Sequence, residues 1–236
     1  MTAFNSATTM LSLYLLLILS SCPAHSFVSS WHRLSTPQLQ SRPPSQPWSS
    51  PSRASTALEA LPKAVVFDLD GCLWAPDMYM LWGGGAPFTV QKDGTLKDCR
   101  GSKVEMLGAV PEVLLELKTN PKWEGVQVCI ASCTDEPSWA QQCLKLFKMA
   151  DDAPLKSVMM VEEIHGGNKQ THLRNIAERT GIALEDMLFF DNERGNCVDV
   201  SAIGVTVAYV PRGVTALAWD RALANFPSDG IIQGNK

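Results

Sequence analysis

The chain has 236 residues, of which 45% are apolar, and a formal charge of −4. This length and composition fit one medium-sized globular domain. The sequence contains no basic run, which argues against a nucleic acid as the partner. Its seven cysteines include no Cys-x-x-Cys pair, which argues against a zinc site and a disulfide scaffold and favours dispersed thiols in a reducing compartment.

The first 60 residues differ in composition from the rest of the chain. Residues 10–19 (MLSLYLLLIL) form an apolar run too short to span a bilayer, and small residues precede Phe27, so residues 1–26 are predicted to be a signal peptide. Residues 27–60 are rich in Ser and Pro, and their only acidic residue is Glu59. Such a segment buries too little apolar surface to fold, so we expect it to be disordered, like a transit peptide.

Together the two segments resemble the bipartite presequence of algae with complex plastids. The resemblance implies delivery to a plastid, and no stable membrane association is expected after the leader is removed. Secretion or an endomembrane location, with residues 27–60 as a linker, is the alternative. Residues 61–236 are expected to form the folded domain.

From residue 63 onward, short apolar runs alternate with amphipathic segments, a pattern typical of a parallel sheet with crossover helices. Strands are predicted at residues 64–68, 126–132, 157–161, 187–191 and 205–210. Helices are predicted at residues 111–118, 137–147, 169–180, 195–203 and 214–226. The strands are almost continuously apolar, which indicates burial on both faces and a three-layer α/β/α fold with a Rossmann-like core.

Residues 75–108 form an irregular segment between the first predicted strand and the first helix. Within it, Asp93-Gly94 separates two alternating runs in residues 88–99, which predicts a β-hairpin. This hairpin is either a flap over the functional site or an edge hairpin, and it leaves little room for a cap domain. Residues 83–85 (GGG) follow no strand, so we expect a flexible loop and no phosphate-binding cradle there.

Two aspartates follow the first predicted strand. Asp68 and Asp70 are two residues apart, so in extended chain their side chains face the same side. Two like charges in one pocket are costly unless a cation or a proton intervenes. Asp191, at the end of another strand, would complete an all-oxygen site of the kind that Mg²⁺ prefers. The alternative for Asp68 and Asp70 is a polar turn at the end of the strand. A calcium-binding loop is excluded, because the glycine and glutamate that such a loop requires are absent at the corresponding positions.

Two further residues fit a phosphate group. Ser132 ends a strand and offers a hydroxyl group near the next helix, although it could also be a helix cap. Lys169 follows Asn168, a predicted N-cap, at a helix start where the helix dipole disfavours a cation. A residue that breaks a local rule is a functional candidate, here as a positive charge for phosphate.

These residues are similar to the four motifs of the haloacid dehalogenase (HAD) superfamily: Asp-x-Asp, Ser or Thr, Lys and Asp, in that order. More narrowly, four stretches of the sequence resemble the magnesium-dependent phosphatase family of that superfamily: VVFDLDGCLW (65–74), FTVQKDGTLKDCRG (88–101), GNKQTHL (167–173) and FFDNERGNCVDVSAIGV (189–205). The resemblance covers nearly all of the chain after residue 63. It implies a phosphatase with a HAD core and little or no cap.

The resemblance also implies a role for each residue. Asp68 would be the nucleophile that forms an aspartyl-phosphate, and Asp70 would be the general acid and base. Mg²⁺ would be held by the carboxylates of Asp68 and Asp191 and the backbone carbonyl of Asp70. The transferring phosphoryl group would be bound by three residues: Ser132, Cys133 and Lys169. The expected substrates are phosphomonoesters, of the phosphotyrosine type or sugar phosphates, on small molecules or phosphoproteins.

The sequence departs from the family at three positions. Cys72 stands where relatives have Thr, Cys133 where they often have Arg, and Asn192 where a second Asp is frequent. A disulfide switch between Cys72 and Cys133 is one reading, but two small packing residues are the ordinary one.

Other polar residues fit structural roles better. Glu162, Glu163 and Glu193 are predicted to be solvated or to lie behind the site. His165 is predicted to lie in a loop and His172 on a helix face.

The alternative for the whole protein is a catalytically silent relative that binds a phosphorylated ligand or acts as a scaffold.

Overall fold

The computed structural model describes residues 60–235. The predicted signal peptide, and residues 27–59 of the predicted transit-like segment, lie outside the described residues. None of the helices in the described part is both long enough and apolar enough to span a membrane.

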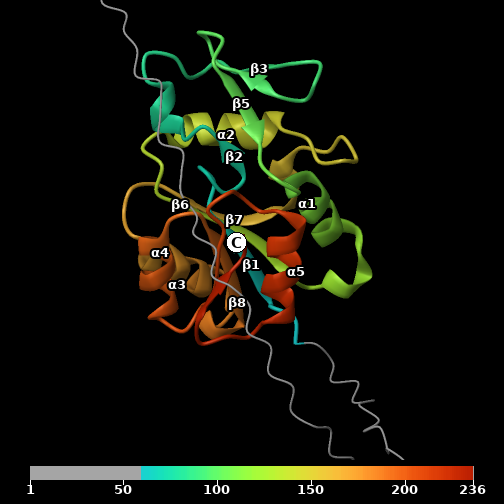
Figure 1. Cartoon of the computed structure of the whole chain (residues 1–236), viewed down its shortest axis with the longest axis vertical. Helices are drawn as coiled ribbons and strands as arrows, with labels where there is room; N and C mark the ends of the chain where they lie inside the picture. The colour runs from blue at the N-terminus through green and yellow to red at the C-terminus, as the bar shows by residue number, and fades with distance from the viewer. Residues whose placement is uncertain (1–59, 236) are drawn as a thin grey trace, which may run out of the picture. The chain divides into compact units, whose positions relative to one another are not determined.

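A six-stranded parallel sheet lies at the centre of the described domain (Figure 1). Its strand order is β10-β9-β8-β1-β6-β7. The strands, in chain order, are β1 (Ala64–Phe67), β6 (Gln127–Ser132), β7 (Met159–Ile164), β8 (Met187–Asp191), β9 (Thr206–Tyr209) and β10 (Ile231–Gln233). The first strand of the chain is thus paired on both sides, which explains its completely buried, apolar sequence.

Helices cover both faces of this sheet. They are α1 (Val110–Thr119), α2 (Pro137–Leu146), α3 (Lys169–Thr180), α4 (Arg194–Ser201) and α5 (Ala216–Ala224). Alternate β1 residues enter two separate apolar cores: Val65 and Phe67 pack with residues of α1, α2 and α5, whereas Ala64 and Val66 pack with residues of α3 and α4. The predicted three-layer α/β/α architecture and parallel sheet are confirmed.

Two parts of the sheet differ from the prediction. The strand expected at residues 157–161 begins at Met159 and continues to Ile164, because a short 3-10 helix occupies Leu155–Val158. β10 was not predicted, since its three residues give too short an apolar pattern.

The segment between β1 and α1 forms a second, antiparallel sheet with strand order β2-β5-β4-β3. Its strands are β2 (Trp74–Ala75), β3 (Thr89–Val90), β4 (Leu96–Lys97) and β5 (Lys103–Met106), with a short 3-10 helix at Met78–Leu81. We call residues 74–106 the flap. The predicted hairpin is confirmed as β3 and β4, but it is only half of the flap sheet. Gly94 has a φ of 81°, which explains the glycine in the turn.

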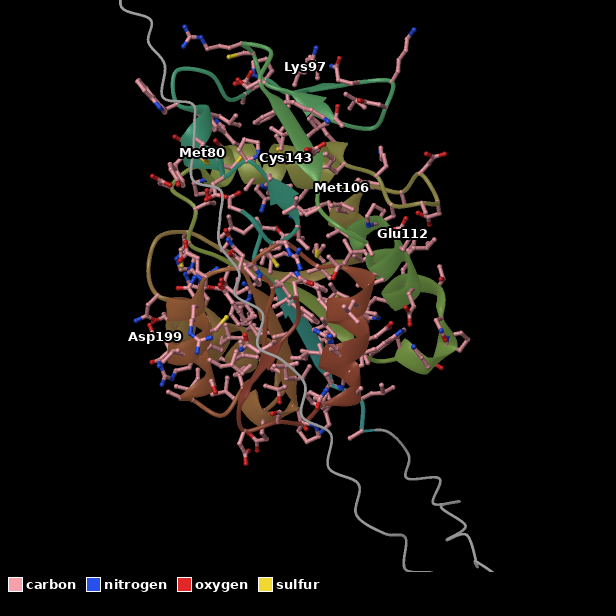
Figure 2. The ribbon with its side chains drawn as sticks, viewed as in Figure 1. Met80, Lys97, Met106, Glu112, Cys143 and Asp199 are labelled. Carbon is pink, nitrogen blue, oxygen red and sulfur yellow. The ribbon has the colours of Figure 1, made fainter. Side chains whose placement is uncertain are left out.

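The flap packs against α2 (Figures 1 and 2). Phe88 packs edge-on against Trp139, with ring centroids 6.5 Å apart, and the Phe88 N–H donates to Oε1 of Gln142 at 2.5 Å. The loop at residues 83–85 was expected to be flexible, but Gly85 N–H donates to the buried Asp98 carboxylate at 3.1 Å and its Cα lies against the Trp139 ring. The flap is therefore a packed element attached to the core.

Candidate active site

A pocket of about 110 Å³ lies where the parallel strands end and the flap begins. Ligand sites of open α/β sheets form at this edge, because the loops that follow the strands converge there. The residues that line the pocket are Asp68, Asp70, Asp77, Tyr79, Ser132, Cys133, Thr134, Asp135, Lys169, Glu193 and Asn196.

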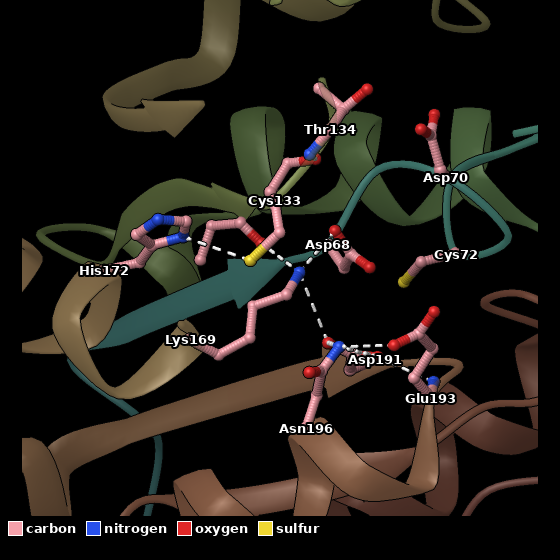
Figure 3. A network of polar contacts seen from close by, with 12 residues as sticks. Asp68, Asp70, Cys72, Cys133, Thr134, Lys169, His172, Asp191, Glu193 and Asn196 are labelled. Carbon is pink, nitrogen blue, oxygen red and sulfur yellow. Dashed lines mark hydrogen bonds and ion pairs between the residues drawn. The ribbon is translucent and has the colours of Figure 1, made fainter. Parts of the chain in front are cut away.

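Three buried charges meet beside this pocket (Figure 3). Nζ of Lys169 lies 2.6 Å from Oδ1 of Asp68 and 3.4 Å from Oδ2 of Asp191. It also donates to the carbonyl oxygen of Ala131 at 2.7 Å. The lysine thus connects the ends of β1, β6 and β8, which are neighbours in the sheet.

The start of α3 places Lys169 in this position. Oδ1 of Asn168 accepts a hydrogen bond from the Thr171 N–H at 2.9 Å, which confirms the predicted N-cap. Burial alone would lower the pKa of Lys169, but the nearby Asp68 and Asp191 raise it above the ordinary lysine value. The ammonium group is therefore charged, and its carboxylate neighbours explain why a lysine stands at a helix N-terminus.

Asp191 is fully buried at the end of β8. Its Oδ1 accepts the Glu193 N–H at 2.7 Å, and its Oδ2 accepts Nδ2 of Asn196 at 3.1 Å. Burial and the charge of Asp68 raise the pKa of Asp191, whereas Lys169 lowers it. The carboxylate thus lies in a place where a further cation would stabilise its charged form.

The donor chemistry of this cluster fits a hard divalent cation. Two carboxylates face one ammonium group, since Lys169 is the only Lys or Arg of residues 60–235 paired with Asp68 or Asp191. No group of three His, Cys, Asp or Glu side chains within residues 60–235 has metal-binding geometry. The expected ligand set contains only two carboxylates and a backbone carbonyl, so it would not form such a group.

Asp70 lines the pocket, but its carboxylate is turned toward the flap and away from Lys169 (Figure 3). Nε1 of Trp74 donates to Oδ1 at 2.8 Å, and the N–H of Met78 donates to Oδ2 at 3.1 Å. Burial raises the pKa of Asp70 to about 6, although these two hydrogen bonds oppose the shift. A carboxyl group with this pKa can both donate and accept a proton near neutral pH.

Ser132 ends β6 and is buried beside the pocket, as the sequence predicts. Its Oγ accepts the Thr134 N–H at 3.4 Å, and the Thr134 hydroxyl oxygen accepts the Glu136 N–H at 3.3 Å. These contacts shape the loop between β6 and α2 so that Ser132, Cys133 and Thr134 all line the pocket.

The two cysteines near the site have different partners. The buried Cys72 thiol donates to the carbonyl oxygen of Phe190 at 3.5 Å. The Cys133 thiol donates to the carbonyl oxygen of Gly167 at 3.3 Å, and its sulfur lies 3.9 Å from Nδ1 of His172 (Figure 3). Both thiols are free, and burial raises the pKa of each. The geometry favours packing and loop-holding roles over a disulfide switch.

Two polar residues are more buried than expected. Glu163 is buried, because Arg179, Asn175 and His165 all bond to its carboxylate. His172 is on α3 as predicted but is fully buried.

Asn192 does not line the pocket. It packs against Gly71, where a Cβ atom would lie 2.2 Å from its Nδ2. Asn192 therefore contacts the loop that carries Asp68 and Asp70 and is not part of the pocket lining.

Four pocket residues were missed by sequence reasoning: Asp77, Tyr79, Asp135 and Asn196. Asp135 and Asn196 follow strands that carry predicted site residues, so a search of the whole strand-end loops would have found them. Asp77 and Tyr79 reach the pocket only because the flap folds back on the Asp68–Asp70 loop, and no sequence signal shows this.

In sequence, the chain is similar to a known family and to known proteins. A family model described as Acid Phosphatase matches residues 60–229. Magnesium-dependent phosphatase 1 of Homo sapiens is 38% identical over 166 residues, which are 70% of this chain and 88% of that protein. A HAD-like hydrolase superfamily protein of Schizosaccharomyces pombe is 34% identical over 150 residues, which are 61% of this chain and 83% of that protein.

Among solved structures, a haloacid dehalogenase-like hydrolase of Streptococcus pneumoniae covers 73% of this chain and 93% of its own chain, with 13% identity and a TM-score of 0.44. The family model spans well over half of the chain, and the human relative is matched over most of its length. The chain therefore belongs to the acid phosphatase family and, like its Schizosaccharomyces pombe relative, to the haloacid dehalogenase superfamily.

Proposed function

We propose that this protein is a Mg²⁺-dependent phosphatase that hydrolyses phosphomonoesters through an aspartyl-phosphate on Asp68. The observation that carries the proposal is the buried Asp68–Lys169–Asp191 cluster beside a pocket at the carboxyl edge of the sheet. The family and its relative named as a magnesium-dependent phosphatase support the same activity.

Asp68, Asp191 and the backbone carbonyl of Asp70 would hold the Mg²⁺ ion. Bound there, Mg²⁺ would neutralise part of the carboxylate charge and polarise the phosphoryl oxygens. Lys169 would bind the phosphoryl group together with Ser132 and the loop that carries Cys133. These side chains are rigidly placed, since the loop is shaped by hydrogen bonds and Lys169 by two ion pairs.

In the first half of the reaction, a carboxylate oxygen of Asp68 attacks the phosphorus atom. The bond between phosphorus and the leaving oxygen breaks, and Asp70 donates its proton to that oxygen. An alcohol leaves, and the phosphoryl group remains on Asp68.

In the second half, the Asp70 carboxylate accepts a proton from a water molecule, whose oxygen attacks the phosphorus. The bond between phosphorus and Asp68 breaks, phosphate leaves, and both aspartates return to their starting states. A pKa of about 6 suits Asp70 for both transfers, because it can change protonation state within one cycle.

A catalytically silent phosphate-binding protein is less consistent with the site. Binding alone would need Lys169 and the Ser132 loop, but it would not need an acid–base carboxyl group. Asp70 has such a group, with its pKa raised by burial and its position set by two donors.

The direct test is hydrolysis of p-nitrophenyl phosphate by the purified protein. We expect turnover with Mg²⁺, none with EDTA, and a loss on the order of 10⁴-fold in Asp68→Asn. Asp199→Asn is the matched control, because Asp199 is exposed on α4 and outside the pocket. An inactive wild-type protein with Mg²⁺ would support the silent alternative.

We also propose that the protein is delivered to a plastid. The support is the composition of residues 1–60, with an apolar run followed by a basic, Ser-rich segment. A fluorescent protein fused behind residues 1–60 should accumulate in the plastid of an alga with complex plastids. Fluorescence in the medium or the endomembrane system would favour the alternative location.

A further inference from the structure

The mouth of the pocket carries an excess of negative charge. Among its lining residues are five carboxylates and one ammonium group, that of Lys169. Asp68 and Asp70 are used by the proposed chemistry. The remaining three are Asp77, Asp135 and Glu193, and none of them forms an ion pair with a Lys or Arg of residues 60–235.

These three carboxylates come from different segments. Asp77 precedes the 3-10 helix of the flap, and Asp135 lies between β6 and α2. Glu193 lies between β8 and α4, as Figure 3 shows. Asp77 is half-buried, whereas Asp135 and Glu193 are exposed. The negative charge is therefore distributed over separate walls of the pocket and is not confined to one loop.

No cation of the pocket lining compensates this charge. Lys169 is 2% exposed and already paired with Asp68 and Asp191. Arg194, which follows Glu193 directly, is outside the lining, and its guanidinium carbon lies 6.0 Å from the centroid of the Tyr209 ring. A substrate that reaches beyond its phosphate therefore meets carboxylates at the mouth.

One exposed aromatic residue also lines the pocket. Tyr79, in the 3-10 helix of the flap, lines the pocket and keeps 57% of its surface exposed. Its neighbour Met80 is equally exposed (Figure 2). An aromatic ring beside carboxylates is a surface that attracts an organic cation, through the ring face as well as through the charges.

We propose that the pocket selects phosphomonoesters whose leaving group carries an ammonium group and discriminates against leaving groups that carry a second anion. This inference rests on the proposed phosphatase function and names the substrate class of the same site. The physical reason is Coulombic: Asp77, Asp135 and Glu193 attract a cationic leaving group and repel an anionic one. The phosphate itself would be held by Lys169 and Mg²⁺ in all cases. Nucleotides, bisphosphates and phosphorylated acids are then poor substrates.

The test uses three phenyl phosphates that differ only in the para substituent: aminomethyl, methyl and carboxymethyl. The aminomethyl ester carries a positive charge and the carboxymethyl ester a negative charge at about the same distance from phosphorus, and the methyl ester carries no charge there. We expect kcat/KM to fall in that order, with about a tenfold ratio between the first and the last, and the ratio to shrink in high salt because exposed charges are screened.

Two variants identify the charges responsible. Asp77→Asn combined with Asp135→Asn should reduce the cation-to-anion ratio by about threefold or more, because two of the three mouth charges are removed. Asp199→Asn, which removes an exposed charge outside the pocket, should leave the ratio unchanged. The ratio is internal to each variant, so partial loss of folded protein does not affect it.

Each outcome has one meaning. Turnover of all three esters without a charge order, or a ratio that the double variant does not change, overturns the preference and leaves the phosphatase function standing. Failure to hydrolyse any of the three in the presence of Mg²⁺ overturns the proposed function and the preference with it.

Discussion

The parallel sheet and the flap hold their carboxylates by different means. Asp68 and Asp191, at the sheet edge, are buried and share one lysine. Asp70 is only two residues from Asp68, yet both of its oxygens accept hydrogen bonds from the flap, from Trp74 and Met78. The sheet thus fixes the groups expected to bind phosphate and metal, and the flap fixes the group expected to move protons.

This difference explains how two neighbouring aspartates can have separate roles. Asp68 lies against the Lys169 ammonium group at the edge of the sheet and lines the pocket, which is where a nucleophile must stand. A carboxyl group that is mostly desolvated and bonded to neutral donors keeps a pKa of about 6, which suits an acid and base. Four variants separate the roles of the sheet and the flap.

Asp70→Asn removes the proton-transfer group and leaves the sheet cluster intact. With p-nitrophenyl phosphate, whose leaving group needs no proton, we expect a burst of p-nitrophenol followed by turnover about 10³-fold slower than in the wild type. The burst arises because Asp68 is still phosphorylated while water is no longer activated. Stopped-flow absorbance measures both phases. A slow reaction without a burst would place Asp70 in the first step, and turnover at the wild-type rate would place it outside catalysis.

Lys169→Met removes the positive charge of the sheet cluster at similar side-chain length. We expect kcat/KM to fall by roughly 10²- to 10³-fold and the free energy of unfolding to fall by about 3 kcal/mol, since two carboxylates remain buried without their partner.

The two carboxylates of this variant also predict a pH dependence. Burial raises the pKa of Asp191 in the folded state and Lys169 opposes this shift, so the variant should gain more stability than the wild type as the pH falls from about 8 to about 5. Urea unfolding at several pH values measures this gain. A pH-independent difference from the wild type would contradict the buried-charge explanation.

Trp74→Phe removes one hydrogen bond from the flap to Asp70 and keeps an aromatic ring against Phe147, 6.0 Å away between centroids. The Trp74 bond lowers the pKa of Asp70, so its loss should raise that pKa by about one unit. Activity on an alkyl phosphate, which needs protonated Asp70, falls above this pKa in the wild type. In Trp74→Phe the decline should move to higher pH, with kcat changed by roughly tenfold or less. An unshifted pH profile would contradict flap control of Asp70.

Asp98→Ala should affect the flap alone. The Asp98 carboxylate accepts the N–H groups of Gly85, Arg100 and Ser102 at 3.1, 2.9 and 2.7 Å. Its loss leaves these donors without their partner and should cost about 2 kcal/mol of flap stability. Hydrogen exchange should accelerate in residues 74–106 and stay slow in the parallel sheet. Asp93→Ala, at the exposed hairpin turn, is the control, and equal acceleration in both variants would contradict the role given to Asp98.

The sequence predicts the parallel sheet and its site residues well, and it predicts the flap poorly. Strands such as residues 64–67 are buried on both faces, so their apolar runs are long enough to recognise, and their polar ends lead directly to Asp68, Ser132 and Asp191. The flap strands are two to four residues long and partly exposed, so only the Asp-Gly turn gives a signal.

Side-chain pairing was also beyond sequence reasoning. Glu163 is buried because Arg179 reaches it from the end of α3, 16 residues away in the chain. Tyr79 and Asp77 reach the pocket only through the return of the flap toward Asp70. Such contacts depend on tertiary packing, which local patterns do not encode.

An aspartyl-phosphate on Asp68 can be trapped chemically during turnover. Protein quenched during turnover with Mg²⁺ and substrate is treated with borohydride, which reduces an acyl phosphate to an alcohol, and its peptides are analysed by mass spectrometry. We expect the Asp68 side chain alone to be converted to the alcohol, and only when substrate is present. Conversion at another carboxylate, or none in Asp70→Asn protein, where the intermediate should accumulate, would contradict it.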